Sequence, residues 1–161
     1  MEDQLHRLID ESIKLELYVA DLYMVFYNTF KRDADFWWKL ANEEKNHAAL
    51  IKSARQLFAS DRDFPKTLLV KNVDTVARFN KRLLSLIDHY KKVPPTREEA
   101  FNCALETEDS LPETAYQYAM QTPADSLQMR ILQKLNDGNK DHAERICKYM
   151  MENGITITYR R

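Results

Sequence analysis

Glycine occurs only twice in this chain of 161 residues, at Gly138 and Gly154. An average chain of this length would contain about eleven glycines, at roughly 7%. Phosphate-binding loops, dinucleotide-binding turns and nucleophile elbows each need glycines only a few residues apart. These two glycines are sixteen residues apart, so the sequence excludes all three motifs. Tight β-hairpins also depend on glycine, and its scarcity therefore favours an all-α fold.

Charge and targeting signals narrow the class of protein further. The formal net charge is −1, from 24 basic and 25 acidic side chains, which is unlike the basic surface of a nucleic-acid binder. The N-terminal residues MEDQLHRLIDES lack the pattern of a secretory signal. The longest apolar run, over 22–27, is six residues, against the ~20 of a membrane span. We therefore expect a single cytoplasmic domain over 1–161, with no nucleic-acid or membrane partner.

Four long segments repeat apolar residues at the spacing of an α-helix. Thr96 and Glu99 form the signature of a capping box at the start of the third segment. Thr122 and Pro123 are the expected cap and first residue of the fourth. Pro112 predicts a kink inside the third segment. The four predicted helices cover about 3–28, 35–59, 96–121 and 122–153, followed by a short β-prone tail over 154–161.

The connection between the second and third helices, about 61–95, is too long for neighbouring helices that run up and down. It carries a helical pattern of its own, from about Lys71 to Lys92. A helix of that length spans about 33 Å, which is the length of a bundle. The connection can therefore return the chain to its starting end. The sequence predicts a four-helix bundle with a long helical crossover between helices two and three.

Polar residues interrupt the inward-facing side of each of the four helices. The helical rise gives the height of each polar residue along its helix. In each antiparallel pair of helices these heights differ by no more than about one turn, so the polar residues can meet in one layer. Buried carboxylates that meet in this way repel one another unless a cation compensates them. Carboxylate and imidazole ligands suit Fe, Mn or Zn. The interrupting residues are Glu16 in the first helix, Glu44 and His47 in the second, Glu108 in the third, and Asn139 and His142 in the fourth.

Up to about Met151, the chain resembles the ferritin-like superfamily, and most closely the rubrerythrin-type di-iron domain. The segments that carry the resemblance are ELYVADLY, ANEEKNHAAL, ALETEDSL and NKDHAERI. The resemblance implies one or two bound iron ions (with Mn or Zn as alternatives), a reaction with dioxygen or peroxide, and an unidentified external electron donor. It also implies that Glu16 and Glu108 are terminal ligands, that Glu44 is a bridging ligand and that His47 and His142 are imidazole ligands. Tyr23 becomes the hydroxyl donor that orients a carboxylate, and the candidate catalytic residue.

Two departures from the family pattern affect the second half of this ligand set. Asn139 stands where the family has a glutamate, and Leu111 stands where rubrerythrins have an extra one. The three remaining carboxylates supply a charge of −3 against +4 for two divalent ions. We therefore expect a firm metal site and a weaker one. The firm site would lie near Glu16, Glu44 and His47, and the weaker site near Glu108 and His142, with Asn139 as a poor amide ligand.

A second interpretation is a degenerate ferritin-like bundle that binds one metal or none and acts as a structural or interaction module. The same polar residues would then form a buried hydrogen-bonded network, with Glu44 or Glu108 protonated or paired with a histidine. Glu106 is an alternative to Glu108 but is out of phase with the apolar positions of its helix. Trp37 and Trp38 are adjacent and cannot both face the core, so one of them can mark the surface of a homodimer.

Overall fold

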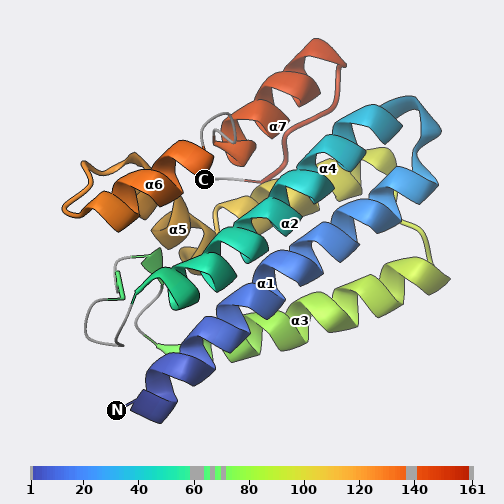
Figure 1. The fold of residues 1–161 in the computed structure, drawn as a ribbon. Helices are drawn as coiled ribbons and strands as arrows, with labels where there is room; N and C mark the ends of the chain where they lie inside the picture. Colours follow the sequence, from blue (N-terminus) through green and yellow to red (C-terminus); the bar gives the residue numbers. More distant parts are fainter. Residues whose placement is uncertain (1, 59–63, 66–67, 70–71, 137–140, 160–161) are drawn as a thin grey trace.

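The computed structural model describes residues 2–58, 64–65, 68–69, 72–136 and 141–159. Within these ranges the regular elements are seven α-helices and one short 3-10 helix, without a strand, so the predicted all-α class is confirmed (Figure 1). None of the described helices is long and apolar enough to cross a membrane. The elements are α1 (Glu2–Thr29), η1 (Lys31–Asp33), α2 (Ala34–Leu57), α3 (Val73–Lys92), α4 (Arg97–Glu108), α5 (Leu111–Gln121), α6 (Leu127–Leu135) and α7 (His142–Glu152).

Helix α1 lies between α2 and α3 and packs against both (Figure 1). Its contact with α2 is centred on large apolar side chains, among them Phe26 and Trp37, whose ring centroids are 4.9 Å apart. Both side chains are fully buried, and each such burial contributes roughly 2–3 kcal/mol. Trp37 faces the core, whereas Trp38 is 55% exposed, as their adjacency requires.

The expected helix in the long connection is present as α3. Asn72 caps it, because its side chain accepts hydrogen bonds from the backbone N–H groups of Asp74 and Thr75. Its buried face lies against α1, where Asn80 Nδ2 donates to the Glu11 backbone carbonyl at 2.9 Å. Its other face carries exposed basic side chains, so α3 is amphipathic along its whole length.

The third predicted helix is two helices, and the expected kink at Pro112 is wrong. The chain leaves the helix at Asp109–Ser110 and starts α5 at Leu111, so Pro112 lies in the first turn of a new helix. In the first turn a backbone N–H has no partner within the helix, so the absence of an N–H in proline costs no hydrogen bond there. The break moves the inward face by one residue. Tyr116 is buried, whereas Tyr118 is 66% exposed.

The fourth predicted helix is also wrong as a single element. Helix α6 is capped by Ser126 rather than Thr122, and the Ser126 hydroxyl accepts from the Met129 N–H at 3.1 Å. Helix α7 starts after Asp141, whose side chain accepts from the Glu144 N–H at 3.0 Å. Leu132 of α6 is buried, while Ile131 is 41% exposed. The residues between the two helices, which include Gly138 and Asn139, lie outside the described part of the chain.

The C-terminal segment is held against α4 without forming a strand in its described part, 155–159. Gly154 ends α7 with φ +63°, a left-handed conformation that favours glycine. The next residue, Ile155, donates its N–H to the Met150 carbonyl at 2.9 Å. Asn102 then binds the segment, accepting from the backbone N–H groups of Thr158 and Tyr159. The Asn102 side chain thus forms hydrogen bonds with this β-prone segment that a neighbouring strand would otherwise form.

Candidate metal centre

Five of the residues predicted from the sequence meet in the interior. Each is at most 4% exposed, and they come from α1, α2, α4 and α7. Glu44 and His47 lie one turn apart on α2 and project to the same side. Glu16 comes from α1, which packs on α2, and Glu108 and His142 come from α4 and α7, which pack on each other. The five residues are Glu16, Glu44, His47, Glu108 and His142.

Glu44 is the centre of this cluster. Its Oε2 lies 3.0 Å from Nδ1 of His47, and its Oε1 lies 2.5 Å from Nδ1 of His142. The two imidazole rings are nearly parallel, with centroids 5.2 Å apart. His47 Nδ1 is also 3.3 Å from Oε2 of Glu16, and His142 Nδ1 is 3.5 Å from Oε1 of Glu108. Each histidine therefore faces Glu44 and one further carboxylate.

Glu113 is a sixth member that was not predicted. It is fully buried on α5, and neither of its carboxylate oxygens has a hydrogen-bond partner among the described residues. One ligand atom each from Glu113, Glu16 and Glu44 can be chosen so that all three lie within 4.8 Å of one another. The break at Asp109–Ser110 brings Glu113 to this place, because it changes which residues of the following helix face inward.

A local signal for Glu113 exists in the sequence. Ser110, Pro112 and Glu113 form the Ser-x-x-Glu pattern with an early proline that is typical of a helix start. In a capping box the glutamate would turn back to its own helix end, as Glu99 does toward Thr96. No side-chain cap is made at Ser110. The Glu113 carboxylate is therefore not used at the helix terminus and is free to belong to the buried cluster.

The potential ligand atoms fall into two groups that share Glu44. One group is Glu44, His47 and His142, and the other is Glu16, Glu44 and Glu113, each with its atoms within 4.8 Å of one another. The predicted pairs are also present as contacts, since His47 lies beside Glu16 and His142 beside Glu108. Two features were not predicted: Glu113 adds a carboxylate beside Glu16, and both imidazoles converge on Glu44.

A surrounding set of side chains orients the cluster. The Tyr23 hydroxyl donates a hydrogen bond to Oε1 of Glu108, which is the contact expected of Tyr23. Nε2 of His142 lies 2.9 Å from Oε2 of Glu43, and the Arg145 guanidinium pairs with that same oxygen. Glu43 was not predicted, because its place beside Glu44 in the sequence puts it off the inward face of a single helix. It fixes the ring of His142 so that Nδ1 points at Glu44.

Burial and mutual charge strongly affect the acid–base properties of these groups. Burial, reinforced by the Glu44 carboxylate, raises the pKa of Glu16 to about 8, against a lowering by the nearby His47. Burial likewise raises the pKa of Glu113 well above its ordinary value. Burial also acts to raise the pKa of Glu44, but His142 and His47 outweigh it and hold that pKa below the ordinary value. Without a cation, the cluster therefore keeps protons at neutral pH.

Unsatisfied buried atoms test whether the site fits a cation. Among the described residues, two cluster members carry buried polar atoms with neither a hydrogen-bond partner nor an ion-pair partner. Each such atom costs about 1–3 kcal/mol, and carboxylate oxygens and imidazole nitrogens are what Fe, Mn and Zn bind. The residues present therefore fit a divalent metal. The atoms are Nε2 of His47 and both carboxylate oxygens of Glu113.

The other sequence candidates lie away from the cluster. Glu106 faces the outside of α4 and pairs with Arg82 of α3, so its exclusion is confirmed. Cys103 and Cys147 are both half-buried and make no disulfide. Asn139 cannot be placed, because it lies outside the described residues.

Comparison with known proteins gives no relative for this chain. No family model matches it, and neither do any curated proteins or solved structures.

Proposed function

We propose that this chain is a ferritin-like helical protein that binds two divalent transition-metal ions, with iron the favoured metal. One observation carries the proposal. Four buried carboxylates and two buried imidazoles from five described helices converge around Glu44, and both oxygens of Glu113 and Nε2 of His47 have no partner among the described residues. The rubrerythrin-type resemblance of the sequence supports the same assignment.

The helix contacts support a bundle in which α1 and α2 form one pair, and α4 and α7 another. In this interpretation α5 and α6 are offset continuations of the third and fourth bundle helices. Helix α3 packs on α1 and serves as the crossover between α2 and α4. The cluster then lies at the level where the third bundle helix breaks, which explains how a residue of α5 can reach it.

Charge balance supports two ions rather than one. Glu16, Glu44, Glu108 and Glu113 together supply −4, which matches +4 for two divalent cations. The sequence alone suggested a deficit, because Asn139 stands in place of a glutamate. In our proposal Glu113 supplies the missing carboxylate from a different helix. Glu44, which belongs to both groups of potential ligands, is the residue placed to bridge the two ions.

Bound iron would supply redox chemistry with dioxygen or peroxide, with electrons from an external donor. The residues of the chain prepare the site for this chemistry. Glu43 holds Nε2 of His142, and the Tyr23 hydroxyl holds one oxygen of Glu108. A cavity of about 10 Å³ lies against Glu16 and is lined partly by Pro112 and Tyr116. It has room for about one water-sized molecule.

Metal analysis tests the proposal. Protein expressed in iron-supplemented medium, or loaded anaerobically with Fe(II) and desalted, should contain close to two metal ions per chain. Glu44→Ala should remove most of this metal, because it takes the shared carboxylate from both groups. Glu98→Gln is the matched control, since Glu98 is an exposed glutamate of α4. Metal-free protein that takes up none on titration would reject the proposal.

The metal-free structural module is a second candidate function, and the contacts of the two histidines favour it. Protonated His47 and His142 can pair with Glu44 and Glu16 without any cation. In that case a chelator would leave the melting temperature unchanged. Bound metal predicts the opposite, because a ligand that binds only the folded state raises the stability of that state.

A further inference from the structure

A second site of interest lies on the other side of α4, in a groove between α3 and α4. The groove has a volume of about 520 Å³ and is separate from the buried cluster. This volume lies within the roughly 300–1,000 Å³ range of small-molecule sites. On the α3 side the lining runs from Thr75 to Tyr90, which corresponds to about 22 Å of helix. The groove is therefore long and narrow.

Apolar side chains make up much of the lining. Helix α3 contributes Phe79, Leu83 and Leu86, which recur at the spacing of one helix face. Pro112 and Tyr159 lie among the residues on the opposite side. An apolar chain laid along α3 would bury surface against all of these groups, and such burial is favourable in proportion to the area covered.

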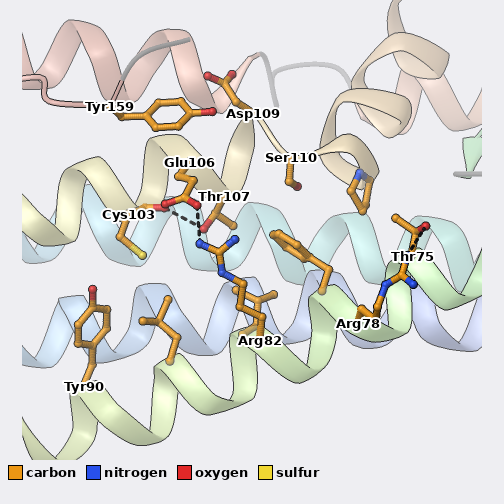
Figure 2. Close-up of a pocket in the computed structure, with 14 residues that line it drawn as sticks. Thr75, Arg78, Arg82, Tyr90, Cys103, Glu106, Thr107, Asp109, Ser110 and Tyr159 are labelled. Atoms are coloured by element: carbon orange, nitrogen blue, oxygen red, sulfur yellow. Dashed lines mark hydrogen bonds and ion pairs between the residues drawn. The ribbon is translucent and has the colours of Figure 1, made fainter.

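The charges along the groove are unevenly paired. Arg82 forms an ion pair with Glu106, which joins α3 to α4 across the middle of the groove (Figure 2). Arg78 has no carboxylate partner within the described part of the chain, and its contact is with Thr75 Oγ1 at 3.5 Å. Asp109, the other acidic lining residue, lies beside Tyr159 and away from Arg78 (Figure 2). The four lining charges therefore sum to zero, but Arg78 has no carboxylate beside it.

The uncompensated charge lies at one end of the groove. Figure 2 shows Thr75 and Arg78 toward one end, Tyr90 and Cys103 at the other, and Ser110 between them on the side of Asp109. The apolar lining leads away from Arg78 along α3.

We propose that this groove binds a linear monocarboxylate amphiphile, a medium-chain fatty acid. Its carboxylate lies against Arg78, and its alkyl chain follows Phe79, Leu83 and Leu86 toward Tyr90. A single negative charge is specified because Arg82 is already neutralised by Glu106. The proposal does not depend on the metal centre, since none of the six cluster residues lines this groove.

Calorimetric titration of dodecanoate into the full chain, below its critical micelle concentration and with chelator present, tests the proposal. We expect saturable binding of one dodecanoate per chain. Arg78→Gln should weaken it about tenfold, as for loss of a charged hydrogen-bond partner, and should leave dodecanol binding unchanged. Leu86→Trp, which fills the groove, should weaken both ligands. Lys81→Gln is the control, because Lys81 is exposed on α3 outside the groove.

Three results would overturn the proposal. The first is the absence of saturable dodecanoate binding to protein whose circular dichroism and melting temperature show it to be folded. The second is binding of dodecyltrimethylammonium as tight as that of dodecanoate. The third is an equal loss of affinity in Arg78→Gln and Lys81→Gln. Because chelator is present throughout, none of these outcomes bears on the metal centre.

Discussion

Glu113 and Glu44 each place a carboxylate oxygen within 4.8 Å of the other, although they come from α5 and α2. Both side chains are fully buried. Two carboxylates this close repel each other when both are charged. The pair therefore destabilises the metal-free protein when both carboxylates are charged, and it favours the binding of a cation that lies between them. A substitution of Glu113 should separate these two effects.

Replacing Glu113 with glutamine should affect stability and metal binding in opposite directions. Because the folded pKa of Glu113 is raised, the stability of the wild-type protein is complete at low pH and falls as pH rises above the ordinary glutamate value. The loss from one such group is up to about 1.4 kcal/mol per pH unit. Metal-free Glu113→Gln should therefore gain stability over wild type between pH 5 and pH 8 in thermal unfolding.

The same variant should bind the second metal ion about tenfold or more weakly, because it lacks one of the four carboxylates. Anaerobic titration with Mn(II) or Fe(II) measures this loss. Glu98→Gln, an exposed change on α4, should alter neither property. If Glu113→Gln bound metal as tightly as wild type, Glu113 would be a buried carboxyl without a role in metal binding.

Metal binding should release protons. Burial raises the pKa of Glu16 to about 8, so Glu16 holds a proton at pH 7 in the absence of metal, and burial also raises the pKa of Glu113 above its ordinary value. A cation that binds these carboxylates must displace the protons they hold. Calorimetry at pH 7 in two buffers of different ionisation enthalpy should give different apparent binding enthalpies, and metal affinity should fall as pH is lowered. Identical enthalpies in the two buffers would contradict the prediction.

The inward-facing residues could be assigned from the sequence in the first half of the chain but not in the second. Residues of α1 and α2 could be assigned because the apolar spacing of each helix runs unbroken from end to end, so Glu16, Glu44 and His47 were placed correctly inside. Residues of the third and fourth predicted helices could not be assigned in this way, because each of these helices is interrupted. The break of two residues at Asp109–Ser110 shifts the inward-facing positions of the following helix by one residue. An apolar spacing extended across the break therefore assigns the wrong residues to the interior.

The missing members of the site follow from the same cause. Glu113 enters the cluster only because of that break. Glu43 lies beside a predicted ligand, and its contact with His142 depends on how α7 packs against α2, which no local pattern encodes. Tyr23 was assigned correctly as a carboxylate partner, through the resemblance of its segment to the ferritin-like family.

The orientation of His142 provides a further prediction. Glu43 holds Nε2 of this ring at 2.9 Å and leaves Nδ1 to face Glu44. Glu43→Ala should lower metal affinity by about 10–100-fold, as is typical for residues that orient a ligand. Glu43→Gln, which keeps a hydrogen-bonding side chain there, should retain more of the affinity than Glu43→Ala. Equal affinity in wild type and Glu43→Ala would show that the contact does not orient a ligand.

A network far from the cluster should govern stability in acid. Asp33 accepts two hydrogen bonds from Arg97, at 2.8 and 2.7 Å, and one from Tyr149 at 2.9 Å, and so ties η1 to α4 and α7. Burial acts to raise the pKa of Asp33, but these partners outweigh it and lower that pKa. The stabilisation is therefore complete above the ordinary aspartate pKa and is lost as pH falls through the lowered value.

Asp33→Asn should accordingly cost about 2 kcal/mol at pH 7, the value of hydrogen bonds to a charged group, and much less near pH 2. Urea unfolding at the two pH values measures the difference. Asp88→Asn, at an exposed position of α3, should show little effect at either pH. A destabilisation by Asp33→Asn that is the same at both pH values would exclude the ionised Asp33–Arg97 pair as its source.

The most direct test of the metal centre is an anomalous difference map, measured at the iron edge, from crystals of iron-loaded protein. We predict two strong peaks inside the bundle, both within bonding distance of the Glu44 carboxylate, with a Glu113 oxygen coordinating one of them. A map with no peak among Glu16, Glu44, Glu108 and Glu113, or with iron only on the surface, would contradict the account and leave a buried network of protonated acids and histidines.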